Sequence, residues 1–509
     1  MASTLPTGAG RVGSTPSSPA LPASVARFPD WGWALLLTLL GGILRWYRIG
    51  ANSLWVDEFA TLKIVTLPFA EILRAAAAVN FCPPLHFWLV NGVVSVLGVS
   101  ETSLRIVSAA AGTLTIPVAW LLIRELTRSR AVALVSTALL AVNPLHIWYS
   151  QEARAYALLV LLGTSALLFL VLATRTGALR DWAGFVCCTA GTVLTHTIGP
   201  LFLIVSWGWA LLSSRRAALL RPLVLSSIAV GLIAAPFAFV IAGAVAHATG
   251  THSPGRPLTG LEIPYTLLTY VVGYSFGPST REIQNLGPVA ALRLHSLESG
   301  ISAAVMAGLL FLMLSRRTAG RMPLFILCIV PIVAMLLGSA TSGKAYQARY
   351  ALAGLVGFCG LAAGGLHGLS TRFRAPATAA VLTLCVWADA QWYFVPRYWK
   401  DDSREAVTWL SQAVPAGSVI LTAPDYVAGV LSHYAGLQRA PLRLIGADSV
   451  AWERVRPAAL MLTRLHHVPD PESLRNQFRE LVGPGMRDDT IGGYEILLRI
   501  EDTTRSPRP

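Results

Sequence analysis

Residues 149–173 read YSQEARAYALLVLLGTSALLFLVLA, a short polar motif followed by an apolar run that is long enough to cross a membrane. A spanning helix needs about 20 mainly apolar residues, and inside lipid every backbone polar group must be satisfied within the protein. Similar runs recur along the chain. We expect about eleven spans, at 31–49, 105–123, 131–149, 154–173, 182–197, 198–213, 222–243, 298–315, 323–341, 350–369 and 377–394. The predicted fold class is therefore an α-helical polytopic membrane protein.

The composition of the chain agrees with this class. Of its 509 residues, 54% are hydrophobic and only 13% are charged, whereas soluble proteins have about 45–50% and about 25%. These values exclude an ordinary soluble globule and a disordered chain. The formal net charge of +14 leaves two explanations, nucleic-acid binding or a surplus of basic residues on one side of a membrane.

Arginines between the apolar runs predict the orientation of the chain in the bilayer. Cytoplasmic loops of membrane proteins are enriched in Lys and Arg. At least two arginines lie in each of the connecting loops 124–130, 174–181, 214–221, 316–322 and 370–375. All of these loops are cytoplasmic if the N-terminus is cytoplasmic and the short run 84–98 does not span. We therefore expect 84–98 to form an interfacial or re-entrant helix on the outer face, and we expect no nucleic-acid partner.

The chain divides into three predicted parts. Residues 1–29 are rich in Pro, Ser, Ala and Gly and predict a disordered cytoplasmic tail. Residues 30–394 form the transmembrane part, with a first outer loop at 50–104 and a large outer loop at 244–297. Residues 395–509 combine short apolar runs with helical patterns, which is typical of a small extracytoplasmic α/β domain.

Short apolar runs in the C-terminal part predict its strands. They lie at 418–422, 442–445, 459–463 and 494–500, and a helical pattern covers 403–412. No nucleotide-binding glycine-rich loop occurs there. The six cysteines of the chain show no CxxC or Cys/His spacing, so the sequence predicts neither a disulfide framework nor a zinc site.

Polar residues gather at the outer ends of the expected spans. The set comprises Asp57, Glu58, Gln151, Glu152, Arg154, His196, Lys344, Tyr346, Arg349 and Tyr350. A carboxylate at this boundary can act as general base toward a hydroxyl group. Arg and Lys can hold a phosphate and stabilise the charge that grows on it when it leaves. Such a set fits a single, inverting displacement that transfers a sugar from a lipid phosphate.

Each of these residues also has a purely structural interpretation. Adjacent Asp57 and Glu58 could be solvated surface, Glu152 and Arg154 a pair at helix ends, and Arg349 a side chain that snorkels to the interface. A lipid-linked-sugar flippase or transporter would need mid-span charges, broken helices and internal repeats, of which the sequence shows few. A membrane protein that binds envelope glycans without catalysis is the third alternative.

Several motifs follow one another in a recognisable order. They are LRWYRIGANSLWVDEF (44–59), CPPLHFWL (82–89), SETSLRIVSAAAG (100–112), NPLHIWYSQEARAYAL (143–158), THTIGP (195–200), YQARYAL (346–352) and YWKDDSREAVTWL (398–410). This order resembles the bacterial lipid-phosphate-sugar-dependent glycosyltransferases of the GT-C fold, glycosyltransferase family 39. The group includes protein O-mannosyltransferases, aminoarabinose transferases of lipid A and rhizobial lipid A core glycosyltransferases.

The resemblance implies a fold, a donor and a location. It implies eleven to thirteen spans and an amphipathic juxtamembrane helix in the first outer loop. It implies a polyprenyl-phosphate sugar donor, an acceptor hydroxyl on the outer face, and residence in the bilayer of the bacterial cytoplasmic membrane. The sugar and the acceptor, whether protein, lipid or polysaccharide, stay open.

The resemblance also implies residue roles. Asp57 resembles the catalytic base, and Glu58 supports it or contacts the acceptor. Glu152 and Arg154 resemble active-site residues, and Arg349 resembles a residue near the donor phosphate. A further position matches the SLR motif, where Arg105 resembles a structural or phosphate contact on the outer face.

The loop before Pro83 departs from the family pattern. Relatives often carry an acid and a histidine there, but this chain has Asn80, Phe81 and Cys82. We therefore expect no metal ligand from this loop and no cofactor, while dependence on a divalent metal elsewhere stays open. His86 stands where relatives often have an aromatic residue, so acceptor contacts are expected to differ.

Overall fold

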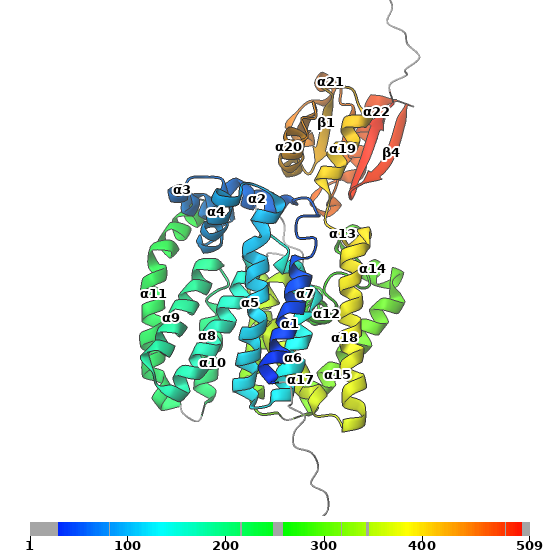
Figure 1. The fold of residues 1–509 in the computed structure, drawn as a ribbon. Coiled ribbons are helices and arrows are strands. Elements are labelled where there is room, and N and C mark those ends of the chain that lie inside the picture. The colour runs from blue at the N-terminus through cyan, green and yellow to red at the C-terminus, as the bar shows by residue number, and fades with distance from the viewer. Residues whose placement is uncertain are drawn as a thin grey trace, which may run out of the picture.

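The computed structural model describes residues 29–80, 82–213, 216–247, 258–316, 318–342, 346–483 and 485–500. Residues 1–28 of the predicted tail lie outside this range. Long helices form a bundle, and a small mixed α/β unit sits at one end of it, above α13 and near α2 (Figure 1). The prediction of a helical polytopic membrane protein with a small C-terminal mixed sheet is confirmed.

Every expected span coincides with helical structure in the bundle. The helices are α1 (Asp30–Trp46), α5 (Glu101–Thr127), α6 (Arg130–Ala141), α7 (Pro144–Ser150), α8 (Tyr156–Thr176), α9 (Leu179–Thr195), α10 (Leu201–Leu212), α11 (Arg216–His247), α15 (Ser296–Ser315), α16 (Arg321–Ser342), α17 (Leu355–His367), which the 3₁₀ helix η1 (Ala348–Gly354) precedes, and α18 (Thr371–Phe394). In the described part of the chain, six helices are long and apolar enough to span, and the bent pair α6–α7 would make a seventh. The others are too short or too polar to count by this measure.

The break between α6 and α7 bends the pair by 55°. Pro144 begins α7 without a backbone N–H, and the Asn143 side chain accepts a hydrogen bond from the His146 amide at 3.0 Å. The buried Arg45 guanidinium of α1 donates to the Ala141 carbonyl oxygen at 2.8 Å and to the carbonyl before it. A carbonyl freed at a break inside a membrane must find such a donor, so α1 stabilises the bend.

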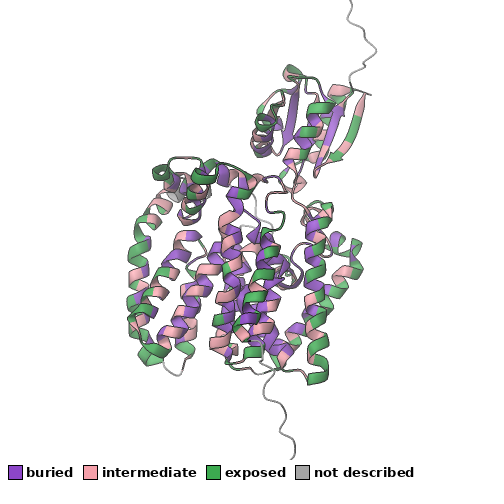
Figure 2. Cartoon of the chain, viewed as in Figure 1, coloured by how far each residue is buried: buried purple, intermediate pink, exposed green. Residues whose placement is uncertain are grey.

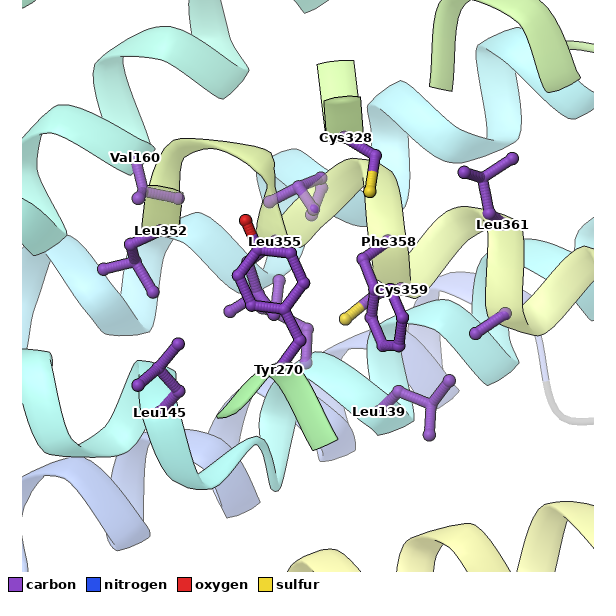
Figure 3. Packing of buried hydrophobic residues seen from close by; sticks show 14 of the residues in the cluster. Leu139, Leu145, Val160, Tyr270, Cys328, Leu352, Leu355, Phe358, Cys359 and Leu361 are labelled. Atoms are coloured by element: carbon purple, nitrogen blue, oxygen red, sulfur yellow. The ribbon is translucent and has the colours of Figure 1, made fainter. Parts of the chain in front are cut away.

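The centre of the bundle is the apolar run of η1 and α17. In Ala348–His367 every residue except Arg349, Tyr350 and His367 is buried, and buried residues fill the middle of the bundle (Figure 2). Small residues let the neighbouring helices approach closely. A Cβ atom on Gly357 would lie 2.6 Å from the Leu324 carbonyl oxygen. Beside it Phe358 packs on Tyr270, with ring centroids 5.4 Å apart (Figure 3).

The remaining helices before the α/β unit are shorter. They are α2 (Val56–Val65), α3 (Phe69–Asn80), α4 (Leu85–Leu97), α12 (Glu262–Val272), α13 (Thr280–Leu286) and α14 (Pro288–Leu294). Helices α2, α3 and α4 cover the end of the bundle near the α/β unit (Figure 1), whereas α12 packs inside the bundle against α7, α18 and η1. The run 84–98 forms α4, whose 13 residues are too few to span a bilayer and which packs against α5 and α2. The predicted outer loop 244–297 holds α12, α13 and α14, with 248–257 outside the described residues.

The C-terminal unit is a five-stranded sheet with the order β2-β1-β3-β5-β4. Its strands are β1 (Val419–Ala423), β2 (Arg443–Gly446), β3 (Ala459–Leu462), β4 (Met486–Ile491) and β5 (Tyr494–Arg499), and its helices are α19 (Ser403–Ala413), α20 (Ala428–Leu437), α21 (Trp452–Val455) and α22 (Pro471–Val482). Strand β1 is parallel to β2 and β3, whereas β5 is antiparallel to β3 and β4. The four expected strands are present.

Strand β4 was not expected from the sequence. It reads MRDDTI, and Arg487, Asp488 and Asp489 give it no apolar alternation. An edge strand that pairs on one side only tolerates such charge, and charge there also discourages pairing with other chains. Its backbone pairing with β5, rather than its composition, makes it a strand.

The glycines of α17 give a stability prediction. Ala in place of a helical Gly normally stabilises by about 0.5–1 kcal/mol, but at Gly357 the new Cβ would meet a backbone oxygen. We expect Gly357→Ala to destabilise the detergent-solubilised protein by about 1–3 kcal/mol. At Gly308 of α15 an added Cβ would have no neighbouring atom within 4 Å, so Gly308→Ala is the matched control. Equal melting temperatures of the two variants would contradict this packing.

Candidate active site

Asp57 lies in the first turn of α2, at the end of the bundle that carries the α/β unit (Figure 1). Its Oδ2 atom is 3.1 Å from Nη1 of Arg349, which lies in η1. Nη1 of Arg154, just before α8, is 3.4 Å from the Asp57 carbonyl oxygen. The Asp57 and Arg349 side chains are 27% and 23% exposed, so this ion pair is partly accessible. Three segments distant in the sequence thus meet at one residue.

The surrounding cations hold Asp57 in its anionic form. Burial by itself raises the pKa of the Asp57 carboxyl group. The positive charges of Arg349 and Arg154, together with those of Arg464 and Lys400, outweigh burial and leave this pKa below its ordinary value. An anion that drew Arg349 away would raise the pKa of Asp57 and make it a stronger base.

The Glu58 side chain points into the protein, away from Arg349, and is fully buried. Its two carboxylate oxygens accept hydrogen bonds from Arg105 Nε and Nη2, both at 2.7 Å, and Oε1 also accepts the Ala153 amide at 2.8 Å. The remaining Arg105 donors bind the carbonyl oxygens of Ile49, Asn52 and Ser53. Every partner of this pair is a protein group, so Glu58 and Arg105 hold the start of α2 in place.

Gln151 also has structural partners. Its Nε2 atom donates to the Tyr47 carbonyl oxygen at 2.7 Å, and its Oε1 atom accepts from Trp392 Nε1 at 2.9 Å. These bonds join the polar loop after α7 to the end of α1 and to α18. Of the predicted site residues, Gln151 is therefore one that positions its neighbours.

Glu152 pairs with a residue that the sequence analysis did not select. Its Oε2 atom is 2.8 Å from Nζ of Lys400, and the two side chains are 1% and 10% exposed. Burial raises the pKa of Glu152, and the charge of Lys400 opposes that rise. The Lys400 ammonium also lies 4.9 Å from the Trp55 ring centroid and 5.2 Å from that of Trp148.

A cluster of aromatic side chains lies next to Arg349. The His196 ring packs on Tyr156 and Tyr350, with centroids 5.4 and 5.5 Å apart. The Arg349 guanidinium lies 5.3 Å from the Tyr350 ring centroid. These rings present apolar faces beside two cations, an arrangement that suits a phosphate joined to a hydrocarbon chain.

The other candidate residues are His86, Tyr346, Lys344 and Asn80, and the structure describes only the first two in full. His86 of α4 is fully buried, and neither ring nitrogen has a hydrogen-bond partner among the described residues. Burial, reinforced by Arg154 and His196, lowers the pKa of His86 to about 3. Tyr346 bonds Thr266 through its hydroxyl at 2.7 Å. The structure does not describe Lys344 or the side chain of Asn80.

Two functional candidates escaped the sequence analysis, Lys400 and Arg464. Lys400 belongs to the YWKDD motif that carried the family resemblance, which was the available signal. Arg464 belongs to the α/β unit, and its guanidinium lies 4.8 Å from the ring centroid of Trp55. No motif near Arg464 in the sequence indicates a functional role. Among the residues that the structure describes, no three His, Cys, Asp or Glu side chains group as metal ligands do.

The buried pair of Glu58 and Arg105 predicts a stability loss that Asp57 does not share. Removing one partner of a buried ion pair costs about 3–5 kcal/mol. We expect Glu58→Gln to lower the melting temperature strongly, because Arg105 keeps an uncompensated charge. Glu71→Gln, on an exposed position of α3, is the control and should change stability by less than about 0.5 kcal/mol.

The pH dependence of this pair has a defined sign. Burial raises the pKa of Glu58, but the charge and hydrogen bonds of Arg105 outweigh burial and hold it below its ordinary value. A depressed pKa in the folded state adds stability above the unfolded-state pKa of about 4.3. That contribution is lost as the pH falls further. The melting temperature of wild type should therefore approach that of Glu58→Gln in acid, and a constant difference would contradict the assignment.

Comparison with known proteins identifies a family that part of the chain matches. Residues 82–240 match the family described as dolichyl-phosphate-mannose-protein mannosyltransferase. No curated protein matches the chain. The matched segment contains α4 and the polar loop with Gln151, Glu152 and Arg154, but it ends before the segments of Arg349 and Lys400.

Solved structures share the fold over almost the whole chain. ArnT from Cupriavidus metallidurans in the apo state aligns with a TM-score of 0.55 and 13% identity, covering 92% of this chain and 98% of that one. The same protein bound to undecaprenyl phosphate aligns with a TM-score of 0.52 and 13% identity, covering 94% and 99%. The chain is therefore a multi-pass membrane protein that shares the fold of ArnT over almost its whole length, and its residues 82–240 match the dolichyl-phosphate-mannose-protein mannosyltransferase family.

Proposed function

We propose that the chain transfers a sugar from a polyprenyl-phosphate donor to an acceptor hydroxyl group on the outer face of the bacterial cytoplasmic membrane. The observation that carries this proposal is the position of Asp57, whose partly exposed carboxylate pairs with Arg349 while Arg154 binds the backbone carbonyl oxygen of the same residue. The family match of residues 82–240 and the shared fold support it. ArnT, which has this fold, was crystallised with undecaprenyl phosphate, and that complex supports a polyprenyl-phosphate donor here.

The proposed reaction is a single displacement at the anomeric carbon. The Asp57 carboxylate takes the proton of the acceptor hydroxyl group, whose oxygen forms the new glycosidic bond. The bond between the anomeric carbon and the phosphate oxygen breaks, and polyprenyl phosphate leaves with the electron pair. One attack from the face opposite the phosphate inverts the anomeric configuration. No redox partner and no protonation of the leaving group are needed.

The arginines supply the second half of the mechanism. Arg349 and Arg154 are placed to bind the donor phosphate and to stabilise the negative charge that it gains as it leaves. When Arg349 turns to the phosphate, its ion pair with Asp57 weakens and the carboxylate becomes more basic. Donor binding would in this way activate the base only when a donor is present.

In this mechanism other predicted residues position the catalytic groups or contact the donor lipid. Glu58 and Arg105 fix α2, and Gln151 fixes the loop that presents Arg154. Lys400 balances buried Glu152. His196, Tyr156 and Tyr350 form the apolar surface for the first part of the polyprenyl chain, as argued from their packing.

We also propose the full topology. It has eleven spans with a cytoplasmic N-terminus, α4 as a juxtamembrane helix, and the catalytic centre and residues 395–509 on the outer side. The arginine-rich loops support this orientation. The common position of α2, α4 and the α/β unit at one end of the bundle agrees with it (Figure 1).

The catalytic proposal predicts the behaviour of Asp57→Asn. Purified protein in liposomes would be given radiolabelled hexosyl and pentosyl undecaprenyl phosphates, with envelopes from a strain that lacks the protein as acceptor. Removing a general base should slow transfer by about 10²–10⁴-fold. Donor binding should stay within a few-fold of wild type, because Arg349 and Arg154 remain.

The control for this experiment is Glu71→Gln, an exposed acid on the same face, which should transfer at the wild-type rate. Full activity of Asp57→Asn would exclude Asp57 as the base. Donor binding by wild type without transfer from any donor would contradict catalysis and favour a flippase or a non-catalytic binding protein.

The topology predicts opposite accessibility for two exposed positions. Thr408, in α19, is exposed on the α/β unit, and the Arg180 side chain, at the start of α9, is 85% exposed. In intact spheroplasts, Thr408→Cys should react with a membrane-impermeant maleimide. Arg180→Cys should react only after permeabilisation, measured against the unsubstituted chain with its native cysteines. The reverse pattern would overturn the orientation.

A further inference from the structure

A cavity of about 500 Å³ lies between the helical bundle and the α/β unit. Its walls come from α13 on the bundle side and from β4, β5 and the end of β3 on the other. The polar lining that matters here comprises Arg281, Asn285, Arg464, Asp488, Thr490 and Glu495. Small-molecule sites have volumes of about 300–1,000 Å³, so the cavity can hold a ligand of one or two sugar rings.

The two arginines of the lining share one carboxylate. Arg281 Nη2 is 3.3 Å from Asp401 Oδ1, and Arg464 Nε is 3.4 Å from Asp401 Oδ2. The Thr463 hydroxyl donates to the same Oδ2 atom at 3.2 Å. Asp401 therefore joins the α13 wall to the wall of the α/β unit and keeps the cavity between them in a defined shape.

The same segment joins the cavity to the candidate active site. Asp401 directly follows Lys400, whose ammonium binds Glu152 at 2.8 Å. Arg464 lines the cavity and also lies over Trp55, the residue that precedes α2. Its charge contributes to the lowered pKa of Asp57. Arg464 thus joins the cavity lining to the segment that begins α2 and carries the base.

The charges of the lining favour a neutral, hydroxyl-rich ligand. Asp401 compensates the two arginines, and Arg475 binds both carboxylate oxygens of Glu495, at 2.6 and 2.7 Å. Asp488 adds a further negative charge, which disfavours a phosphate or a carboxylate. The lining offers guanidinium donors, carboxylate acceptors, and amide and hydroxyl groups that do both. A sugar hydroxyl group donates and accepts and can use all of them.

We propose that this cavity binds a neutral saccharide portion of the acceptor and presents it to Asp57. The inference rests on the proposed function in one respect, that the bound saccharide is the acceptor side of a transfer reaction. The occupancy of the cavity by a saccharide does not depend on transfer and is measured separately.

Two substitutions would fill the cavity from opposite walls without touching the catalytic centre. Thr490 is exposed on edge strand β4, where a large aromatic residue is tolerated. Asn285 is exposed on α13. Thr490→Trp and Asn285→Trp each place an indole in the space, and Thr408→Trp on α19, away from the lining, is the matched control.

The experiment uses the full chain in detergent micelles and saturation-transfer difference NMR. The probes are mannobiose, cellobiose, galactobiose and the charged analogue mannose 6-phosphate. At least one neutral disaccharide should bind to wild type and to Thr408→Trp. Its affinity should fall at least tenfold in Thr490→Trp and in Asn285→Trp, while binding of undecaprenyl phosphate stays unchanged in all four proteins.

Three results would overturn the inference. They are the absence of binding by all neutral disaccharides, undiminished binding in both tryptophan variants, and preference for mannose 6-phosphate. None of these depends on turnover. A chain that binds a disaccharide in the cavity but transfers no sugar would contradict the proposed function and leave the saccharide site standing.

Discussion

The buried ion pair between Glu58 and Arg105 is the constraint on which the outer face depends. Arg105 binds both oxygens of Glu58 and three carbonyl groups of the segment before α2. Successive residues on an α-helix point about 100° apart. With Glu58 directed into the protein, the Asp57 side chain points in a different direction, where Arg349 reaches it. An unpaired charge at either position of the buried pair would be costly, so the direction of Asp57 is strongly determined.

A second constraint lies one layer deeper, where a spanning helix is broken. At the bend between α6 and α7, Arg45 donates hydrogen bonds to the carbonyl oxygens of Ala141 and Leu140. Gln151 then joins the end of α7 to α1 and α18. The loop that carries Glu152 and Arg154 is consequently held from both ends. Broken helices inside membranes are found where they are buried in protein or line a cavity, and here the break positions the outer loop.

The chain carries its cations on separate segments, and their convergence has a chemical result. Arg154 precedes α8, Arg349 lies in η1, Lys400 follows α18 and Arg464 belongs to the α/β unit. Each lowers the pKa of Asp57, although burial acts in the opposite sense. The α/β unit therefore contributes to the electrostatics of the site through the link at Lys400 and Asp401, in addition to forming one wall of the cavity.

The sequence by itself determined the helical ranges, the polytopic class and four of five strands, because apolar runs and their periods are local properties of the chain. It also brought Asp57, Arg154 and Arg349 into consideration through their motifs. Only the tertiary structure decided which of two adjacent acids is buried, that Gln151 and Arg105 have structural partners, and that Lys400 and Arg464 join the site. Strand β4 and the cavity were likewise decided only by the tertiary structure. These features arise from contacts between segments hundreds of residues apart, such as Arg349 with Asp57 and Lys400 with Glu152, and no local pattern encodes which partner a charge will meet.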